Sequence, residues 1–573
     1  MKNMTGKGFD VFCVNDGKTY RAEVGMTLSA LLEKTGVNKG NDLNDTVFAA
    51  LVDNELKQLS HPLSMTRKVE FLTFLHPDGR RCYNRSLCFV LQNAVRELYP
   101  DKILVIDHSL PAGLYCEIRD ARHDESGRRP IYFVTQADID KIRSAMQAII
   151  KRDLPFSKEH TSVDEAEKIF NANNQHHKAE LFRSLGRYFC SIYYLDGKAD
   201  SFHGPLVPST GLLTVFDLIG VGAGFCLRYP SVDNPKTVLP FVPQSKIATT
   251  LKEYSTWCEV MGVNGVGTLN RAILDGKAVK IINLCEALHE RKYAAIADQI
   301  YARRKDFRIV FIAGPSSSGK TSSSLRVACQ CKVLGLNPKV IELDNYFVDR
   351  EKTPKDEKGD YDFEALGAMD LDLLGRQLND LLAGKEVEIP KYDFKAGRST
   401  PSGKGLVLGE KDILIMEGIH ALDPAMVPDV DQSRIFRVYA SALTSLNVDE
   451  NNNISTSDNR LLRRIIRDNR VRGITPENTI LRWNSVRRGE SRNIFPFQEN
   501  ADVFFNSALL YELPMLKYFA EPLLRRILPT SPAYSEAVRL LKFLDFLVAL
   551  SPSEIEAIPP TSIMREFIGG QTL

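Results

Sequence analysis

The pattern of hydrophobic and polar positions divides the chain into stretches of different character. Residues 9–75 contain short alternating segments (VFCV, KTYRAEV, VFAALVDN, KVEFLTF) around TLSALLEKTG, which predicts strands packed on one helix. Residues 76–230 include an amphipathic helical segment, NRSLCFVLQNAVRELYPD, and later the apolar segment GLLTVFDLIGVGAGF. The continuous apolar run FRIVFIAG, residues 307–314, is typical of a strand buried on both faces of a parallel sheet.

Linker composition sets the expected boundaries. The stretch RYPSVDNPKTVLPFVPQSK, residues 228–246, is polar and rich in proline, and helical segments such as 286–304 follow it. We therefore expect four parts: a small β-grasp domain at 1–75, an α+β domain at 76–230, a linker with helices at 231–304, and an α/β domain at 305–573. The last part is expected to be a doubly wound parallel sheet with helices at its C-terminal end.

Composition adds limits on location and partners. With 573 residues the chain exceeds a single core, and its formal charge of +2 argues against a global electrostatic attraction to nucleic acid or membrane. The N-terminus lacks the apolar core of a signal peptide, and the longest apolar segments are interrupted by Asp217, Lys542 and Asp545. Ten cysteines without a CxxC pair favour reduced thiols. We expect a cytoplasmic protein that does not bind membranes.

One short motif carries the strongest chemical signal. The segment Gly314-Pro315-Ser316-Ser317-Ser318-Gly319-Lys320-Thr321 matches the pattern GxxxxGK[ST] between a predicted strand and a predicted helix. Small residues let consecutive backbone amides surround a phosphate, and the helix N-terminus adds a partial positive charge. We expect all eight residues to bind ATP, with Lys320 at the β- and γ-phosphates and the Thr321 hydroxyl on Mg²⁺.

Two acidic residues follow other predicted strands of the same sheet. KVIELD leads into Asp344, and DILIMEG reaches Glu417 after four apolar residues. Because ligands of such sheets bind beyond the carboxyl ends of the strands, both carboxylates should face the γ-phosphate. We expect Glu417 to help hold Mg²⁺ and Asp344 to accept a proton from the attacking hydroxyl.

An arginine-rich helix is the third element. NRLLRRIIRDNRVRG places five arginines at helical spacings of three and four: Arg460, Arg463, Arg464, Arg467 and Arg470. Such a run is often a solvated basic face. In a domain that handles phosphates, it also fits a lid that brings arginines to the transferring phosphoryl group, and we favour this interpretation.

Six segments in order, GPSSSGKT, LDNYF, YDFEALGAMDL, IPKYDF, LIMEGIHAL and RLLRRIIRD, resemble the uridine kinase and phosphoribulokinase family. The resemblance covers about residues 307–510 and implies an ATP- and Mg²⁺-dependent kinase acting on the 5′-hydroxyl of a nucleoside. It also implies roles for residues beyond the phosphate loop. These are Asp344 as general base, Asp362 at the ribose hydroxyls, Tyr392 and Phe394 in the base pocket, and Arg464 and Arg472 in the lid and its flank.

The chain departs from uridine kinases where that family reads its substrate. A histidine after the aromatic pair is replaced by Gly397 followed by Arg398, an arginine by Ile474, and a glutamine by Arg482. The residues expected at the phosphates are therefore kept, whereas those expected to contact the acceptor differ. Arg398 near the acceptor would favour an anionic substrate. Three functions stay open: a nucleoside kinase, a kinase acting on a sugar phosphate, and an RNA-linked regulatory NTPase.

The N-terminal part resembles the TGS module and the editing domain of threonyl-tRNA synthetases. At the four positions where that family carries its HxxxH pair, cysteine and histidine, this chain has Arg85, Phe89, Phe202 and Leu206. Because these side chains cannot replace imidazole and thiolate ligands, we expect no zinc and no editing hydrolysis. Contact with tRNA through these domains, a binding role for the remaining cleft, and homo-oligomerisation all stay open.

Overall fold

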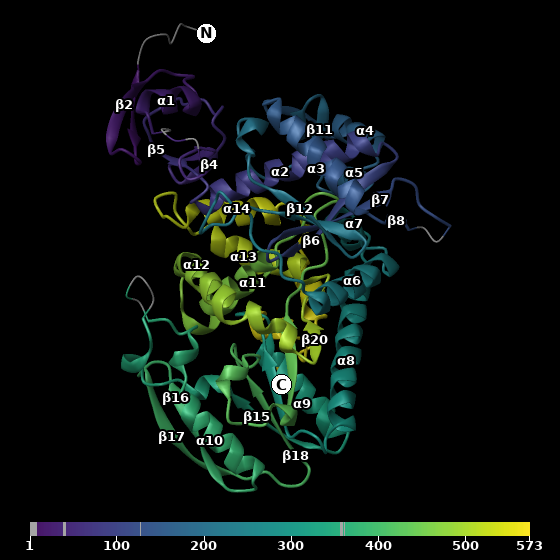
Figure 1. The fold of residues 1–573 in the computed structure, drawn as a ribbon, viewed down its shortest axis with the longest axis vertical. Helices are drawn as coiled ribbons and strands as arrows, with labels where there is room; N and C mark the ends of the chain where they lie inside the picture. Colours follow the sequence, from purple (N-terminus) through teal and green to yellow (C-terminus); the bar gives the residue numbers. More distant parts are fainter. Residues whose placement is uncertain (1–7, 38–39, 41, 126–127, 356–358, 360) are drawn as a thin grey trace.

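The computed structural model describes residues 8–37, 40, 42–125, 128–355, 359 and 361–573 (Figure 1). Its first unit is a five-stranded sheet in the order β2-β1-β5-β3-β4, packed on helix α1 (Leu28–Thr35). Thr27 caps this helix through its hydroxyl, which accepts a hydrogen bond from Ala30 N at 3.2 Å, and Gly36 ends it at φ +65°. The strands are β1 (Phe9–Cys13), β2 (Lys18–Ala22), β3 (Ala49–Val52), β4 (Glu55–Lys57) and β5 (Arg67–Leu72).

The second unit packs helices on two antiparallel sheets. One sheet has the order β12-β13-β7-β6, with β8 paired to β7, and the other has the order β11-β10-β9. Its helices are α2 (Pro77–Leu98), α3 (Gln136–Lys151), α4 (Val163–Ala172) and α5 (His176–Ser184). Its strands are β6 (Lys102–Leu110), β7 (Gly113–Asp120), β8 (Ile131–Tyr132), β9 (Ser157–Ser162), β10 (Phe189–Leu195), β11 (Lys198–Asp200), β12 (Asp217–Val221) and β13 (Gly224–Arg228).

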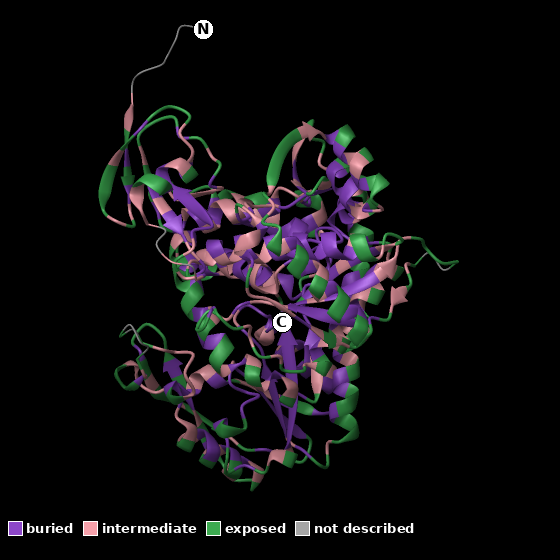
Figure 2. Ribbon diagram, turned by 45° about the horizontal axis from the view of Figure 1, so that its top comes forward, coloured by how far each residue is buried: buried purple, intermediate pink, exposed green. Residues whose placement is uncertain are grey.

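The C-terminal half is built on a parallel sheet in the order β15-β18-β14-β19-β20. The central strand β14 sends alternate side chains to two different cores, with Ile309 and Phe311 on one face and Val310 and Ile312 on the other. Figure 2 shows this sheet buried between helices. The strands are β14 (Ile309–Ala313), β15 (Asn337–Glu342), β18 (Asp412–Glu417), β19 (Ile435–Ser441) and β20 (Val503–Asn506). The predicted α/β fold class is confirmed.

Helices cover both faces of this sheet. One face packs against α10 (Leu371–Leu382), and beside it lies a hairpin of β16 (Val387–Asp393) and β17 (Arg398–Leu406). The other face shares its core with helices from before and after the sheet in the sequence. These are α6 (Ser245–Val260), α7 (Val266–Leu274), α8 (Ala278–Ala302), α9 (Lys320–Val333), α11 (Thr456–Arg467), α12 (Pro476–Asn493), α13 (Glu512–Leu524), α14 (Tyr534–Leu544), α15 (Pro552–Glu556) and α16 (Met564–Ile568).

The C-terminal helices therefore complete the core of the parallel-sheet domain. Phe567 of α16 and Leu540 of α14 belong to the same buried cluster as Val310 and Ile312. Within the part of the chain that the structure describes, none of the helices combines the length and apolarity needed to cross a bilayer.

Candidate active site

The loop Gly314–Thr321 joins β14 to the N-terminus of α9, the context that the motif requires. A Cβ at Gly314 would lie 1.9 Å from the carbonyl oxygen of Ala440 on β19, so only glycine fits there. Gly319 precedes the helix at φ +84°, and Ser317 also has a positive φ, +58°. This tight path leads the loop into the N-terminus of α9, the kind of segment whose backbone amides bind phosphate.

The residues expected at Mg²⁺ meet in the structure. Thr321 Oγ1 donates a hydrogen bond of 2.6 Å to Glu417 Oε1 at the end of β18. Glu417 is buried, and that burial raises the pKa of its carboxyl. Lys320 Nζ lies 3.3 Å from the carbonyl oxygen of Pro315, folded back over its own loop. A hydroxyl, a carboxylate and an ammonium group are thus gathered at the mouth of the loop.

Asp344 follows β15, next to β18 in the sheet, and it lies near the same point. Burial raises the pKa of Asp344 most, the positive charge of Lys320 lowers it, and the charge of Glu342 raises it further. Asp344 in turn raises the pKa of Glu417. A divalent cation would relieve this repulsion between neighbouring carboxylates, so the donor set fits Mg²⁺.

Two arginines of α11 are structural. Arg460 and Arg463 are fully buried and form ion pairs with Glu490 of α12 and Glu512 of α13. Arg460 also donates to the carbonyl oxygen of Ser316 at 3.0 Å. The interpretation of this run as a lid is therefore wrong for these two arginines, because buried acids hold them next to the phosphate loop.

Arg464 and Arg472 remain close to the loop. Arg464 Nη1 donates to Ser316 Oγ at 2.9 Å, while its Nε and Arg472 Nη1 each lie 3.2 Å from a carboxylate oxygen of Asp468. Asp344 and Arg472 affect each other's pKa, which places this guanidinium near the expected base. Asp468 and Glu490 were not predicted, since an acid within an arginine run reads as an ordinary surface residue.

The predicted acceptor side contains an aromatic cluster. The rings of Tyr392 and Phe394 lie 5.0 Å apart, and Phe347, three residues after Asp344, packs on both. The Tyr392 hydroxyl is buried and has no hydrogen-bond partner among the described residues. Phe394 is exposed. One ring is therefore free to stack, and one hydroxyl is free to bind a polar group.

Asp362 and Arg398 are placed less favourably. Asp362 Oδ1 accepts a hydrogen bond from Glu364 N at 3.1 Å, a local turn contact. Burial raises the pKa of Glu364, and Arg464 lowers it, so Glu364 is the carboxylate nearer the arginines. Sequence reasoning missed Glu364. In the β16–β17 register Arg398 pairs with Asp393, whereas Tyr392 pairs with Ser399, so Arg398 lies on the opposite face of the hairpin from Tyr392.

The C-terminal segment closes one side of the loop, which the sequence did not indicate. Ser322 Oγ donates to Glu566 Oε2 at 2.6 Å, and Gln571 Nε2 donates to Ser322 Oγ at 2.8 Å. A Cβ on Gly319 would lie 2.2 Å from Ile563 Cδ1. The last residues of the chain are thus in contact with the first turn of α9.

The four altered positions of the editing-like unit also come together. Arg85 donates to the carbonyl oxygen of Pro205 at 3.0 Å, the rings of Phe89 and Phe202 lie 5.3 Å apart, and Leu206 is buried. Burial lowers the pKa of the neighbouring His203 to about 3. Among the described residues, no cluster of three or more His, Cys, Asp or Glu side chains could hold a metal ion.

Comparisons with known proteins match two different regions. The model of the Phosphoribulokinase / Uridine kinase family matches residues 309–509. The N-terminal region is 29% identical over 212 residues to a threonine–tRNA ligase of Thermotoga neapolitana, covering 37% of this chain and 30% of that protein. A threonine–tRNA ligase of Desulforamulus reducens is also 29% identical, over 213 residues, 37% of this chain and 31% of that protein. The chain spans about a third of the length of these curated relatives.

Solved structures give more distant likenesses. A putative fructose transport system kinase from Silicibacter sp. TM1040 has a TM-score of 0.27 at 16% identity, covering 37% of this chain and 98% of that chain. A possible uridine kinase from Bacillus stearothermophilus has a TM-score of 0.22 at 24% identity, covering 26% and 79%. By the family model alone, residues 309–509 form a domain of the Phosphoribulokinase / Uridine kinase family, and the N-terminal region is similar in sequence to threonine–tRNA ligases.

Proposed function

We propose that this chain transfers the γ-phosphate of ATP to a hydroxyl group of a nucleoside or a related small molecule, with Mg²⁺ bound. The observation that carries the proposal is the meeting of four side chains beyond the sheet. The Thr321 hydroxyl lies 2.6 Å from Glu417, with Lys320 and Asp344 beside them. A phosphate loop that ends at a cation site and a base is the arrangement that phosphoryl transfer needs.

Each residue of this group has one task in the proposed reaction. The loop 314–321 and the Lys320 ammonium group hold the triphosphate, and Asp344 accepts the proton of the attacking hydroxyl. Bound Mg²⁺, held by Thr321 and Glu417, would neutralise charge on the β- and γ-phosphates. Arg464 and Arg472 are positioned to offset the charge that develops on the transferred group.

The acceptor site is proposed between Asp344 and the aromatic cluster. Phe394 offers an exposed ring for stacking, and the unpaired hydroxyl of Tyr392 offers a hydrogen bond to a base or sugar. Binding of the sugar hydroxyls is proposed for Asp362, which accepts a hydrogen bond from Glu364 N, together with the neighbouring Glu364. We leave Arg398 out of this site because of its place on the hairpin, which also weakens the case for a sugar phosphate as acceptor.

The test is an assay of purified full chain with ATP, Mg²⁺ and a panel of nucleosides and sugar phosphates, with separation of phosphorylated products. We expect a nucleoside monophosphate and its loss by about 10²–10³-fold in Lys320→Ala. Lys332→Ala, in the last turn of the same helix and exposed, is the matched control. The proposal would be overturned if none of the acceptors were phosphorylated, or if Lys320→Ala and the natural chain reacted at equal rates.

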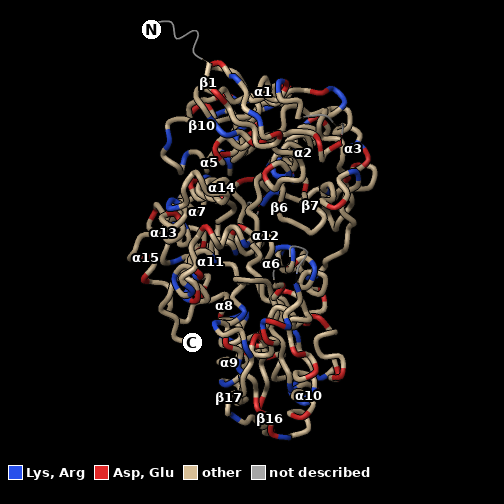
Figure 3. The backbone as a smooth tube through the Cα atoms, turned by 90° about the vertical axis from the view of Figure 1, so that its left-hand side faces the viewer, with Lys and Arg blue, Asp and Glu red and all other residues tan. Residues whose placement is uncertain are grey.

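A second candidate, an NTPase regulated by RNA, is favoured by one other feature. A cleft of about 500 Å³ between the β-grasp unit, the editing-like unit and α14 is lined by Lys57, Lys158, Arg187 and Lys542. Burial and the charges of Lys542 and Lys57 lower the pKa of Lys158. Against this candidate, Lys/Arg and Asp/Glu are interspersed along the whole chain (Figure 3).

Filter binding with tRNA at two salt concentrations separates the two candidates. An RNA function predicts binding that falls steeply with salt, with a slope reduced by about one for each lysine removed in Lys158→Gln and Lys542→Gln. It also predicts ATP turnover that rises with tRNA and needs no small acceptor. Binding that is absent or insensitive to these variants leaves the kinase as the function of the chain.

A further inference from the structure

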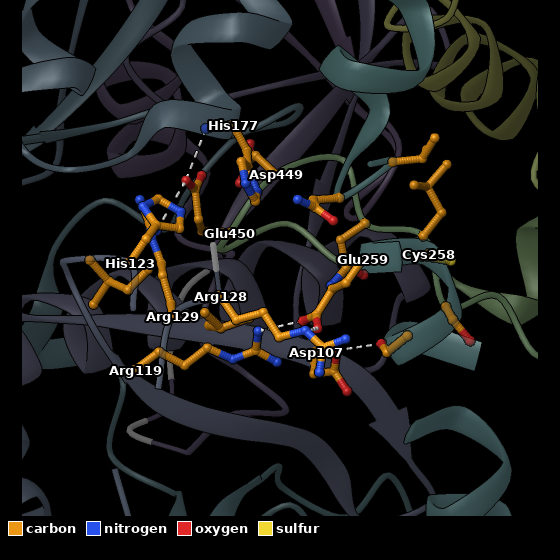
Figure 4. A pocket seen from close by; sticks show the side chains of 18 of the residues that line it. Asp107, Arg119, His123, Arg128, Arg129, His177, Cys258, Glu259, Asp449 and Glu450 are labelled. Carbon is orange, nitrogen blue, oxygen red and sulfur yellow. Dashed lines mark hydrogen bonds and ion pairs between the residues drawn. The ribbon is translucent and has the colours of Figure 1, made fainter. Parts of the chain in front are cut away.

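A polar pocket lies at the junction of the N-terminal and C-terminal halves, outside the candidate active site (Figure 4). Its volume is about 290 Å³, at the lower end of the range for small-molecule sites. Its walls come from β6 and β7, the loop after β7 that carries Arg129, the start of α5, α6, and the segment 442–455 between β19 and α11. Among the described residues that line it, none belongs to the phosphate loop.

The segment 442–455 is held as an added edge on the N-terminal sheet. Ile106 of β6 donates its N–H to the carbonyl oxygen of Glu450 at 2.8 Å and accepts from Asn447 Nδ2 at 3.1 Å. Asn451 Nδ2 donates to the carbonyl oxygen of Leu104 at 2.9 Å. Because β6 is the outer strand of its sheet, these bonds cover its open edge. The pocket is therefore a fixed structure and not a gap between loose domains.

Most charges in the pocket are already paired. Arg119 holds Glu117 at 2.7 Å and Glu259 at 3.1 Å. Asp107 accepts from His108 Nδ1 at 2.8 Å and from Ser255 Oγ at 3.5 Å. These groups shape the floor of the pocket and leave no strong bond to offer a ligand.

Two side chains of opposite charge on the other side of the pocket, Arg129 and Glu450, lack some of their hydrogen-bond partners among the described residues. The side chain of Arg129 is 6% exposed, and its only hydrogen bond among the described residues joins Nη2 to the carbonyl oxygen of Asn174, which leaves Nε and Nη1 without acceptors. Glu450 Oε1 accepts from His177 N at 3.0 Å, but Oε2 has no donor within the described chain. Arg129 Nη1 and Glu450 Oε1 are 3.9 Å apart, too far for a hydrogen bond.

Unused donors and unused acceptors side by side define the ligand. Nη1 of Arg129 has no acceptor and can donate a charge-assisted hydrogen bond to a carboxylate oxygen. Glu450 Oε2 and the unpaired Oδ1 of Asn447 are acceptors that suit an ammonium group. We propose that this pocket binds a small zwitterion with adjacent carboxylate and ammonium groups, a free α-amino acid, through Arg129 and Glu450.

The position of the pocket also connects it to the kinase site. The segment that carries Asn447 and Glu450 continues directly into α11, where Arg460 and Arg464 bind Ser316 of the phosphate loop. An occupied pocket would hold this segment in place and favour one position of α11. This regulatory consequence rests on the proposed kinase function, whereas the binding itself does not.

The test of binding uses the full chain without nucleotide. Each of the common α-amino acids is added singly, and thermal unfolding and titration calorimetry are recorded. We expect at least one to raise Tm by roughly 2 °C or more at saturation. For that amino acid, the matching amine without the carboxylate and the matching acid without the amine are expected to bind at least about tenfold more weakly. If no amino acid binds, or if either analogue binds as well, the proposal is overturned.

Variants locate the site. Arg129→Met and Glu450→Gln are each expected to weaken binding by about tenfold or more, while Arg122→Met, an exposed arginine of the same loop that does not line the pocket, leaves it unchanged. Unchanged affinity in the first two variants would refute the assignment. Should Arg129→Met unfold, Glu450→Gln and the two analogues on the natural chain still decide the question. Amino-acid binding without any effect on ATP turnover would retain the site and remove the regulatory link.

Discussion

The buried pair of Arg460 and Glu490 gives a prediction that separates support of the phosphate loop from catalysis. Glu490 accepts two hydrogen bonds from Arg460, one of them at 2.7 Å, and a third from Ser316 N at 3.0 Å. Both side chains are 1% exposed. Glu490→Gln keeps the shape of the side chain and removes its charge, which leaves the guanidinium buried without an anion.

The expected loss of stability is large for a substitution that replaces one oxygen atom by an NH₂ group. Breaking a buried ion pair by neutralising one partner costs about 3–5 kcal/mol, against a total stability of about 5–15 kcal/mol for a typical domain. For a domain of this size that corresponds to a fall in Tm of roughly 6–20 °C. The KM for ATP should also rise, because Ser316 loses the anion that fixes its amide, whereas Asp344 is untouched and kcat should change less.

The assay is thermal unfolding of the full chain together with steady-state kinetics in ATP. Glu253→Gln, which removes an exposed partner of Lys292, is the control and should leave Tm almost unchanged. The double replacement Arg460→Leu with Glu490→Leu should recover much of the stability, since a buried pair can be exchanged for apolar packing, but should not recover ATP affinity. A Tm for Glu490→Gln within about 1 °C of the natural chain would refute the reasoning.

The other predictions concern the glycine before α9, a buried acid and the N-terminal half. Gly319→Ala should lower Tm more than Gly335→Ala. Gly335 has nearly the same φ, +83°, but a Cβ there would meet open space, so the difference in Tm measures the clash with Ile563. Burial raises the pKa of Asp449 from 3.8 to about 6, so the folded chain holds an extra proton in this window and loses stability on the order of 3 kcal/mol as pH rises through it. As pH rises through this window, thermal scans should show the Tm of Asp449→Asn increasing relative to that of the natural chain. A difference in Tm that does not change with pH would contradict this prediction. A chain lacking residues 1–230 should show faster hydrogen exchange in 442–455 than the full chain, and equal protection would argue against the edge contact.

The sequence predicted the chemistry of the site where that chemistry is local. The phosphate loop, its strand and its helix follow one another in the chain, so their pattern is complete within about 25 residues of sequence. Asp344 and Glu417 could be placed because parallel strands bring their carboxyl ends to one edge. Their meeting with Lys320 and Thr321 in the structure follows from the strand order alone.

The parts that escaped prediction depend on partners distant in sequence. Arg460 and Arg463 have the same spacing as exposed arginines, and only Glu490 and Glu512, from two later helices, reveal that they are buried. The apolar residues Leu461, Leu462, Ile465 and Ile466 share one face of α11 and the arginines share the other, so the helical pattern gave no signal that two of these arginines are buried. The sequence identified Tyr392 as a candidate for the acceptor site. It could not show that Arg398 lies on the other face of the hairpin, because this depends on the register between β16 and β17.

The N-terminal half is best understood as part of the body that supports the kinase site. Arg81 of α2 pairs with Glu536 of α14 at 2.9 Å, and Asp78 accepts from Ser535 at 2.7 Å. Together with the bonds between β6 and 442–455, these contacts join the N-terminal half to α14 and to the segment that precedes α11. The editing-like domain has Phe89 and Phe202 where threonyl-tRNA synthetases have reactive residues. Its contacts with the C-terminal half still give a physical reason to keep its fold. Its sheet edge holds the segment that positions α11, and α11 in turn holds the carbonyl oxygen of Ser316.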